Sequence, residues 1–283
     1  MIHLIAVSII WGFSFVIIKG TLASLDSNFV SLVRLLLSLV IFLPFLRPAK
    51  LSLYDKLRFL GLGGMQFGLM YVAYVASYRY LPAHMIALMT TTTPLMVTIF
   101  GALAAGRFHG RFLIAAMLAV AGGAVLESPH QAPAVSARGV VLVQLSNAAF
   151  AFGQVCYRRL MASKPDLSDR HIFGLLYGGA VAVAALFCLF TTDFHQLSLD
   201  SGQWLALFYL GVVASGLGFF LWNVGARKVN EGLLAIMNNL KIPVAVVASL
   251  LILRESTNYE RLASGCGLLA AALWINERSK RAV

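Results

Sequence analysis

Asparagine, lysine and proline residues interrupt one of the apolar stretches of the chain, from Leu233 to Leu253. Asn238 and Asn239 lie near its middle, Lys241 follows, and Pro243 comes shortly after the lysine. The stretch is long enough to cross a bilayer core as a helix, which takes about 20 residues. Placing an ammonium group near the bilayer centre costs about 2.5–3.5 kcal/mol on insertion scales. We therefore expect the Lys241 side chain to face protein, water or a ligand rather than lipid.

The chemistry open to Lys241 is the binding of an anion. The chain has 11 acidic residues, and all of them lie at the ends of apolar runs or between the runs. None is placed to neutralise an ammonium group deep in a span. The carboxylate of an amino acid or of an organic acid would supply the missing charge. A structural lysine, bonded to backbone carbonyls or to Asn238, is the alternative.

Pro94 and Pro243 predict breaks in two helices. A proline within a helix removes one backbone donor and frees the carbonyl four residues earlier. The segment Ser77–Val97 can be aligned with Ala226–Val246 at an offset of 149 (243 − 94), which places the two prolines opposite each other, each after a polar run. Paired interrupted segments in the two halves of a chain indicate a transporter binding site. We expect both prolines to act as hinges, and simple packing kinks are the alternative.

Further polar and aromatic residues within the apolar runs are candidates for a cavity wall. Trp11 lies in the middle of a run rather than at a membrane interface, where tryptophan usually sits. Tyr74 and Tyr78 share one helix face. Hydroxyl groups such as that of Thr93 can instead repair the helix at a proline, and polar side chains such as Asn147 can join neighbouring helices. The substrate-binding residues predicted from the sequence are Trp11, Ser14, Tyr74, Tyr78, Thr90, Thr93, Asn147, Asn238 and Lys241.

Arg34 is the other charged residue inside an apolar run, and it lies near the start of that run. A long arginine side chain can carry its guanidinium group out to the headgroup layer. We expect Arg34 to extend to the interface in this way. A gating role inside the protein is the alternative.

The composition indicates an integral membrane protein. The chain of 283 residues is 60% hydrophobic and only 12% charged, and its mean hydropathy is +0.84. A soluble chain carries about 25% charged residues. The net charge of +11 could indicate a nucleic-acid partner. We exclude nucleic acid because the basic residues lie between apolar runs and form no basic stripe, which makes the lipid bilayer the expected partner.

Sequence motifs of enzymes and of cofactor sites are absent. The chain contains no HExxH, nucleophile elbow, Walker lysine or GxGxxG loop, and its three cysteines lie inside apolar runs without metal-ligand spacing. We therefore expect no catalytic residues, no metal and no cofactor.

Ten apolar runs approach or reach spanning length. They are Leu4–Lys19, Phe29–Leu46, Phe59–Tyr78, Ala83–Ala105, Phe112–Leu126, Gly139–Leu160, Ile172–Thr191, Trp204–Ala226, Leu233–Leu253 and Tyr259–Ile275. If the N-terminus is cytoplasmic, the cytoplasmic loops hold three times as many lysines and arginines as the outer ones. This asymmetry predicts that both termini are cytoplasmic.

The longest connection, with Pro129 and Pro133, separates five runs from five runs. We predict a first five-helix repeat at 1–128, a linker at 129–137 and a second repeat at 138–283. An odd number of spans per half means that the two halves insert in opposite orientations. Because one chain carries both halves, a monomer is sufficient for a complete transport unit.

Three features together resemble the EamA-type branch of the drug/metabolite transporter superfamily. They are IIWGFSFVIIKG at Ile9–Gly20, the arginine within VRLLLSLVIFLPF at Val33–Phe45, and the two proline-centred helices. The likeness covers the whole chain. It implies an all-α integral membrane protein with ten transmembrane helices, arranged as two inverted five-helix repeats around a central cavity. It also implies efflux across the bacterial inner membrane without ATP hydrolysis.

We therefore expect a secondary transporter that exports small metabolites by alternating access. Amino acids, including aromatic or other hydrophobic ones, are the expected substrates. Efflux of drugs or toxins and an organic-acid permease are alternatives, although pumps for cations commonly use a buried carboxylate that this sequence lacks. A membrane enzyme or receptor without transport activity is the alternative from another class.

Overall fold

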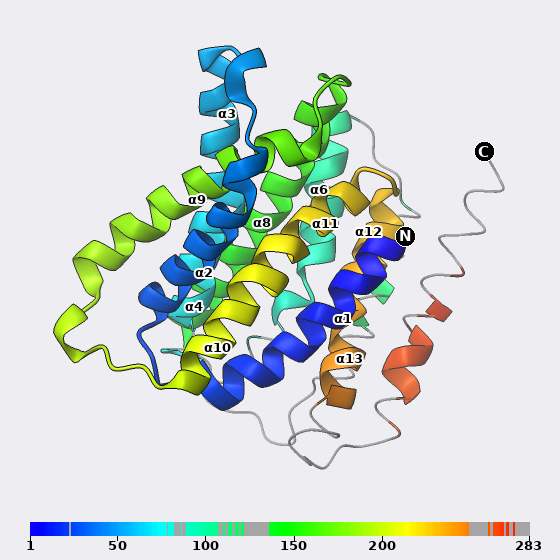
Figure 1. The fold of residues 1–283 in the computed structure, drawn as a ribbon. Coiled ribbons are helices and arrows are strands. Elements are labelled where there is room, and N and C mark those ends of the chain that lie inside the picture. The colour runs from blue at the N-terminus through cyan, green and yellow to red at the C-terminus, as the bar shows by residue number, and fades with distance from the viewer. Residues whose placement is uncertain are drawn as a thin grey trace.

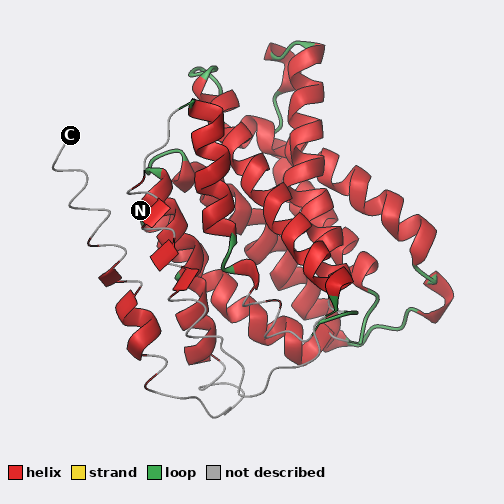
Figure 2. Cartoon of the chain, turned by 180° about the vertical axis from the view of Figure 1, so that it is seen from behind, coloured by secondary structure: helices red, strands yellow, loops and turns green. Residues whose placement is uncertain are grey.

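The computed structural model describes residues 1–22, 24–77, 79–81, 86, 89–106, 110, 113–114, 117–118, 120–121, 136–248, 260, 263–268, 270–271 and 274. Within these residues every regular element is helical, as Figures 1 and 2 show from opposite sides. In chain order the elements are α1 (Ile2–Ile17), η1 (Ile18–Leu22), α2 (Ser27–Phe42), η2 (Leu43–Phe45), η3 (Pro48–Lys50), α3 (Leu53–Gly63), η4 (Gly64–Leu69), α4 (Met70–Ser77), α6 (Thr93–Ala105), α8 (Ala137–Ala162), α9 (Asp169–Thr191), η5 (Phe194–Gln196), α10 (Ser201–Tyr209), η6 (Leu210–Leu217), α11 (Gly218–Ala226), α12 (Glu231–Asn239) and α13 (Lys241–Ala248).

Long apolar helices make the chain a multi-pass membrane protein. In the described part, five helices are long and apolar enough to cross a bilayer: Ser27–Phe45, Leu53–Ser77, Ala137–Ala162, Asp169–Thr191 and Ser201–Ala226. Large apolar side chains also point outward, as Phe190 does with 81% of its surface exposed. The predicted all-helical fold is confirmed for these residues. The count of ten spans and the inverted arrangement stay predictions, because most of the fifth apolar run and parts of the fourth and tenth lie outside the described residues.

Two of the spanning helices contain a π-helical segment, which the sequence analysis did not predict. These segments are η4 (Gly64–Leu69) and η6 (Leu210–Leu217). A π turn displaces the backbone bonds of an α-helix and is frequent at functional sites. Side chains from other helices bond to carbonyls of η6: the Tyr177 hydroxyl donates to the Ser215 and Gly216 carbonyl oxygens at 2.7 and 2.8 Å.

Close backbone contact holds α9 against α3 and η4. A Cβ atom added at Gly63 would lie 1.9 Å from the Leu176 carbonyl oxygen, and one added at Gly179 would lie 1.8 Å from the Leu60 carbonyl oxygen. Only glycine fits at such distances. This packing also brings Tyr177 of α9 within reach of η6.

The helices that carry Pro94 and Pro243 are both interrupted, as predicted. Residues 89–90 are helical, Thr91 and Thr92 form a turn, and α6 begins at Thr93 with Pro94 in its first turn. In the second half α12 ends at Asn239, and α13 begins at Lys241. Pro243 therefore also lies in a first helical turn, where a missing N–H costs little. The role of the prolines as hinges stays a prediction.

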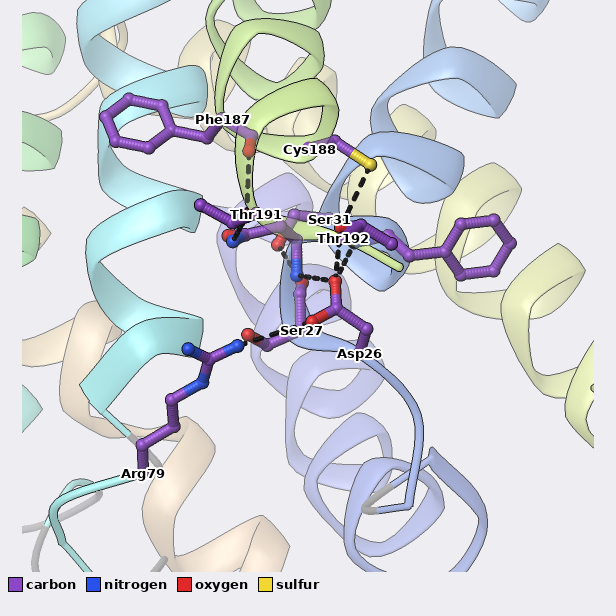
Figure 3. A network of polar contacts seen from close by, with 10 residues as sticks. Asp26, Ser27, Ser31, Arg79, Phe187, Cys188, Thr191 and Thr192 are labelled. Carbon is purple, nitrogen blue, oxygen red and sulfur yellow. Dashed lines mark hydrogen bonds and ion pairs between the residues drawn. The ribbon is translucent and has the colours of Figure 1, made fainter. Parts of the chain in front are cut away.

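A polar network around Asp26 ties the start of α2 to the end of α9 (Figure 3). The Asp26 carboxylate caps α2 by accepting from the backbone N–H groups of Asn28 and Phe29 at 3.1 and 3.0 Å. It also accepts from the Thr192 hydroxyl at 2.6 Å and forms a 3.3 Å ion pair with Arg79. These contacts join segments from both halves of the chain at one end of the bundle.

Candidate functional site

A cavity of about 130 Å³ lies between helices of both halves. α1, which is blue in Figure 1, forms one wall, and it packs against α11, α12 and α13. The described lining residues are Trp11, Ser14, Ile18, Arg34, Met70, Tyr71, Tyr74, Thr90, Thr93, Ser146, Asn147, Phe150, Phe219, Asn238 and Lys241. Pockets that bury drug-sized ligands enclose about 300–1,000 Å³. A substrate of that size therefore needs the walls to move apart.

Lys241 is the first residue of α13 and lines this cavity, where it is partly exposed. Its Nζ atom lies 5.6 Å from the centroid of the Trp11 ring, within the range of a cation–π contact. Among the described residues, no carboxylate or hydrogen-bond acceptor pairs with this ammonium group. Its position at a helix N-terminus, the positive end of the helix dipole, adds to the positive potential. The site therefore favours an anionic or strongly dipolar ligand.

Asn238, on the last turn of α12, offers an unused acceptor. Its side chain is only 3% exposed, and its Oδ1 atom has no hydrogen-bond partner. Its Nδ2 atom makes a long contact of 3.5 Å to Asn239 Oδ1. Leaving a buried acceptor unpaired costs about 1–3 kcal/mol. Because the atom itself is buried, an N–H group of a ligand would pair with it only once the cavity walls have moved apart.

Trp11 is both a cavity wall and a packed core residue. Its indole N–H donates to the Ala214 carbonyl oxygen of η6 at 2.9 Å. Its ring packs edge-on against Phe150 and Phe219 with centroids 6.4 and 5.4 Å apart. The hydrogen bond and the two rings fix the orientation of the indole, so the face under Lys241 is held in place.

Two of the hydroxyl groups on the cavity donate to backbone carbonyls close by in the chain. Ser14 Oγ donates to the Ile10 carbonyl oxygen at 2.7 Å, and Thr93 Oγ1 donates to the Thr90 carbonyl oxygen at 2.8 Å. The repair of the interrupted helix by threonine hydroxyls, one alternative from the sequence, is therefore present. Thr90 itself lines the cavity.

The remaining predicted site residues come from α4 and α8. Tyr74 lines the cavity, and Tyr78 lies outside the described residues. Asn147 lines the cavity and also joins helices, because its Nδ2 atom donates to the Met89 carbonyl oxygen at 2.9 Å. Of the nine predicted residues, the structure therefore brings all except Tyr78 to one cavity.

Arg34 was wrongly expected to extend to the membrane interface. It is 6% exposed, lines the cavity, and donates from Nε to Ser215 Oγ at 3.2 Å. Its guanidinium carbon lies 4.9 Å from the centroid of the Tyr71 ring. The face of α2 that bears Arg34 packs against η6 and α4, so the side chain is turned inward. No local pattern in the sequence indicates this pairing.

The electrostatics of the cavity follow from these positions. Its described lining includes two basic residues, Arg34 and Lys241, and no acidic residue. Charges removed from water need a partner, because desolvation costs several kcal/mol per ion. The cavity is therefore suited to a ligand that carries negative charge.

The fold is shared with a known structure. A solved crystal structure superimposes over 96% of this chain and 94% of its own length, with a TM-score of 0.79 and 14% sequence identity. At that identity the likeness shows a common fold alone.

Curated relatives from bacteria match the chain over nearly its full length. A protein of Pseudomonas aeruginosa named "Probable biotin transporter" is 38% identical, covering 100% of this chain and 99% of its own. Proteins named "Biotin transporter" from Escherichia coli K12 and Salmonella typhimurium are 36% and 35% identical, each covering 98% of this chain and 93% of its own. These relatives are named as transporters, which agrees with a protein that is not an enzyme. They give no support to amino acid specificity.

The family resemblance drawn from the sequence is confirmed. The profile of the EamA-like transporter family matches twice, over residues 1–127 and 137–277, and so covers nearly the whole chain in two repeats. The chain belongs to the EamA-like transporter family.

Proposed function

We propose that this protein is a secondary transporter of biotin, or of a small carboxylate with a similar polar ring, across the bacterial inner membrane. The observation that carries the proposal is the ammonium group of Lys241, which lies over Trp11 on a cavity without an acidic residue in its described lining. The names of the full-length relatives support the choice of biotin among carboxylates.

The chemical groups of biotin suit this cavity. Biotin combines a carboxylate, an apolar chain, and fused rings that bear a ureido group with N–H donors and a carbonyl acceptor. Basic side chains can neutralise the carboxylate, and the unpaired Oδ1 atom of Asn238 can accept from a ureido N–H. Trp11, Phe150 and Phe219 provide an aromatic wall for the apolar part.

Amino acids, the substrates expected from the sequence, suit the cavity less well. Each carries an ammonium group beside its carboxylate. The described lining offers no acidic residue to neutralise that group, and Arg34 and Lys241 would repel it. The same argument weighs against cationic drugs. An organic-acid permease is consistent with the charge of the cavity.

Transport would proceed by alternating access. Ten helices in two inverted repeats, at 1–128 and 138–283 with a linker at 129–137, would rock against each other, with Pro94 and Pro243 as hinges. Both termini would lie in the cytoplasm. The interrupted helices support this scheme, because broken helices at membrane depth are tolerated where they line a cavity.

Transport of radiolabelled biotin into proteoliposomes tests the proposal. We expect accumulation above protein-free liposomes, competition by unlabelled biotin, and no competition by leucine or phenylalanine at the same concentration. Loading the label on either side in turn gives the direction of transport. Biotin flux equal to that of empty liposomes, or competition by amino acids instead, would contradict it.

A further inference from the structure

Arg34 is held in a fixed position by two contacts on different elements. Its Nε–H group donates to Ser215 of η6, and its guanidinium carbon lies over the ring of Tyr71 of α4. The Tyr71 hydroxyl and Ser215 Oγ are themselves 2.9 Å apart and hydrogen-bonded. Ser215 is in turn anchored, because its backbone carbonyl accepts from Tyr177. The guanidinium group is therefore preorganised rather than free to sample rotamers.

The other N–H groups of this guanidinium are available. Arginine has five N–H donors in a planar fork that fits a carboxylate with two parallel hydrogen bonds. In Arg34 the Nε–H group is used, and the remaining donors have no partner among the described residues. The side chain lines the cavity while the residue is buried. A buried guanidinium group stays charged and needs an anion beside it.

Arg34, Lys241 and Trp11 line the same cavity, and Trp11 has a link to each of the two cations. Lys241 lies over the face of the indole ring. The indole N–H edge points to Ala214, whose neighbour in the chain, Ser215, bonds to Arg34. The two cations are thus parts of one cavity, and each has different polar neighbours.

The chemistry around the two cations differs. Lys241 and Asn238 both line the cavity, and an ammonium donor and an amide oxygen acceptor together complement a group that has both a carbonyl oxygen and N–H donors, such as a ureido group. The guanidinium group of Arg34 offers only hydrogen-bond donors, which complement the two acceptor oxygens of a carboxylate.

We infer that Arg34 is the carboxylate subsite of the cavity and that Lys241 with Asn238 binds the polar ring. This assignment rests on the proposed function. It gives Arg34, which was expected from the sequence to extend to the membrane interface, the role of distinguishing a carboxylate from a neutral analogue.

Binding of biotin and of biotin carboxamide to the purified full-length protein tests the inference. The carboxamide has the same rings and chain but no negative charge. Each is measured by competition against radiolabelled biotin. A charge-assisted hydrogen bond contributes about 1.5–3 kcal/mol, so we expect the wild type to prefer biotin by about 10- to 100-fold.

Three variants then separate the roles. Arg34→Gln should weaken biotin and leave carboxamide binding nearly unchanged, which abolishes the preference. Lys241→Met should weaken both ligands by a similar factor and keep the preference. Arg58→Gln is the matched control, because Arg58 is exposed, lies outside the cavity lining, and also lies over a tyrosine ring, at 5.3 Å from the centroid of Tyr54.

The inference is overturned if Arg34→Gln keeps the preference or weakens both ligands equally. If Arg34→Gln does not fold, Ser215→Ala replaces it, because this change keeps the charge and removes the Nε contact. The preference should then fall several-fold, and a full preference in Ser215→Ala overturns the inference. The proposed function fails in a different way, namely when the wild type binds neither ligand.

Discussion

Asn239 donates from its Nδ2 atom to the backbone carbonyl oxygen of Thr91, with the two atoms 3.4 Å apart. This hydrogen bond joins the ends of the two interrupted helices, since Asn239 is the last residue of α12 and Thr91 lies in the turn before α6. The alignment of the two halves placed both residues in the polar runs before Pro243 and Pro94. Residues beside this contact, Thr90 and Asn238, line the cavity. The interrupted helices therefore meet beside the proposed binding site.

Lys241→Met should reduce the affinity for biotin by about 10- to 100-fold, because it removes a charged donor from the cavity. Equilibrium binding of radiolabelled biotin to the detergent-purified protein measures this. Lys228→Met is the matched control, since Lys228 is exposed and follows α11 outside the cavity lining. Equal affinity in Lys241→Met and the wild type would show that the lysine is structural.

Replacing both Pro94 and Pro243 with alanine should slow transport more than it weakens binding. Both prolines lie in first helical turns, where they cost little stability, and alanine would let each helix continue through its break. The turnover rate in proteoliposomes and the binding constant in detergent should be measured on the same protein. Pro48→Ala, in η3, is the control. A turnover rate equal to that of the wild type would count against the hinges.

Asp26→Ala should destabilise the protein by about 1–2 kcal/mol, because it removes the N-cap of α2 together with the acceptor of the Thr192 hydroxyl. Chemical denaturation in detergent, followed by circular dichroism, measures the loss. Arg79→Gln removes only an ion pair whose arginine is 58% exposed, so it should cost less than about 1 kcal/mol. If both variants lose the same stability, the effect of Asp26→Ala comes from the ion pair with Arg79 rather than from the helix cap.

Gly63→Ala should destabilise the protein by about 1–3 kcal/mol or more, because the new methyl group would overlap the Leu176 carbonyl group of α9. Gly61→Ala, on the same helix α3, is the control: an added Cβ atom there has nothing within 4 Å. The free energy of unfolding of the Gly61→Ala control should be unchanged or higher by up to about 1 kcal/mol, because alanine favours a helix more than glycine does. Chemical denaturation in detergent measures the stability of both variants. Equal stability of Gly63→Ala and Gly61→Ala would contradict the close packing of α3 against α9.

Several properties of this protein could be read from its sequence because their causes are local. Long apolar runs indicate segments that lie in the bilayer. A proline interrupts whichever helix contains it. An ammonium group within an apolar run avoids the acyl chains wherever the helix lies. The all-helical class, the breaks at Pro94 and Pro243, and the inward position of Lys241 were therefore predictable. Eight of the nine predicted site residues line one cavity, and most of them are polar residues within apolar runs, which the sequence shows directly.

Other properties depended on contacts between distant segments. The inward turn of Arg34 depends on Ser215, which accepts its hydrogen bond from the π-helical segment η6 and is 181 residues away in the chain. A snorkelling arginine and a buried one have the same local sequence. Only the rotation of α2 against η6 and α4 distinguishes them, because that packing decides whether the guanidinium group finds partners inside the bundle or in the headgroups. The sequence by itself therefore determined which residues must avoid lipid, and the tertiary structure decided which of them share one cavity.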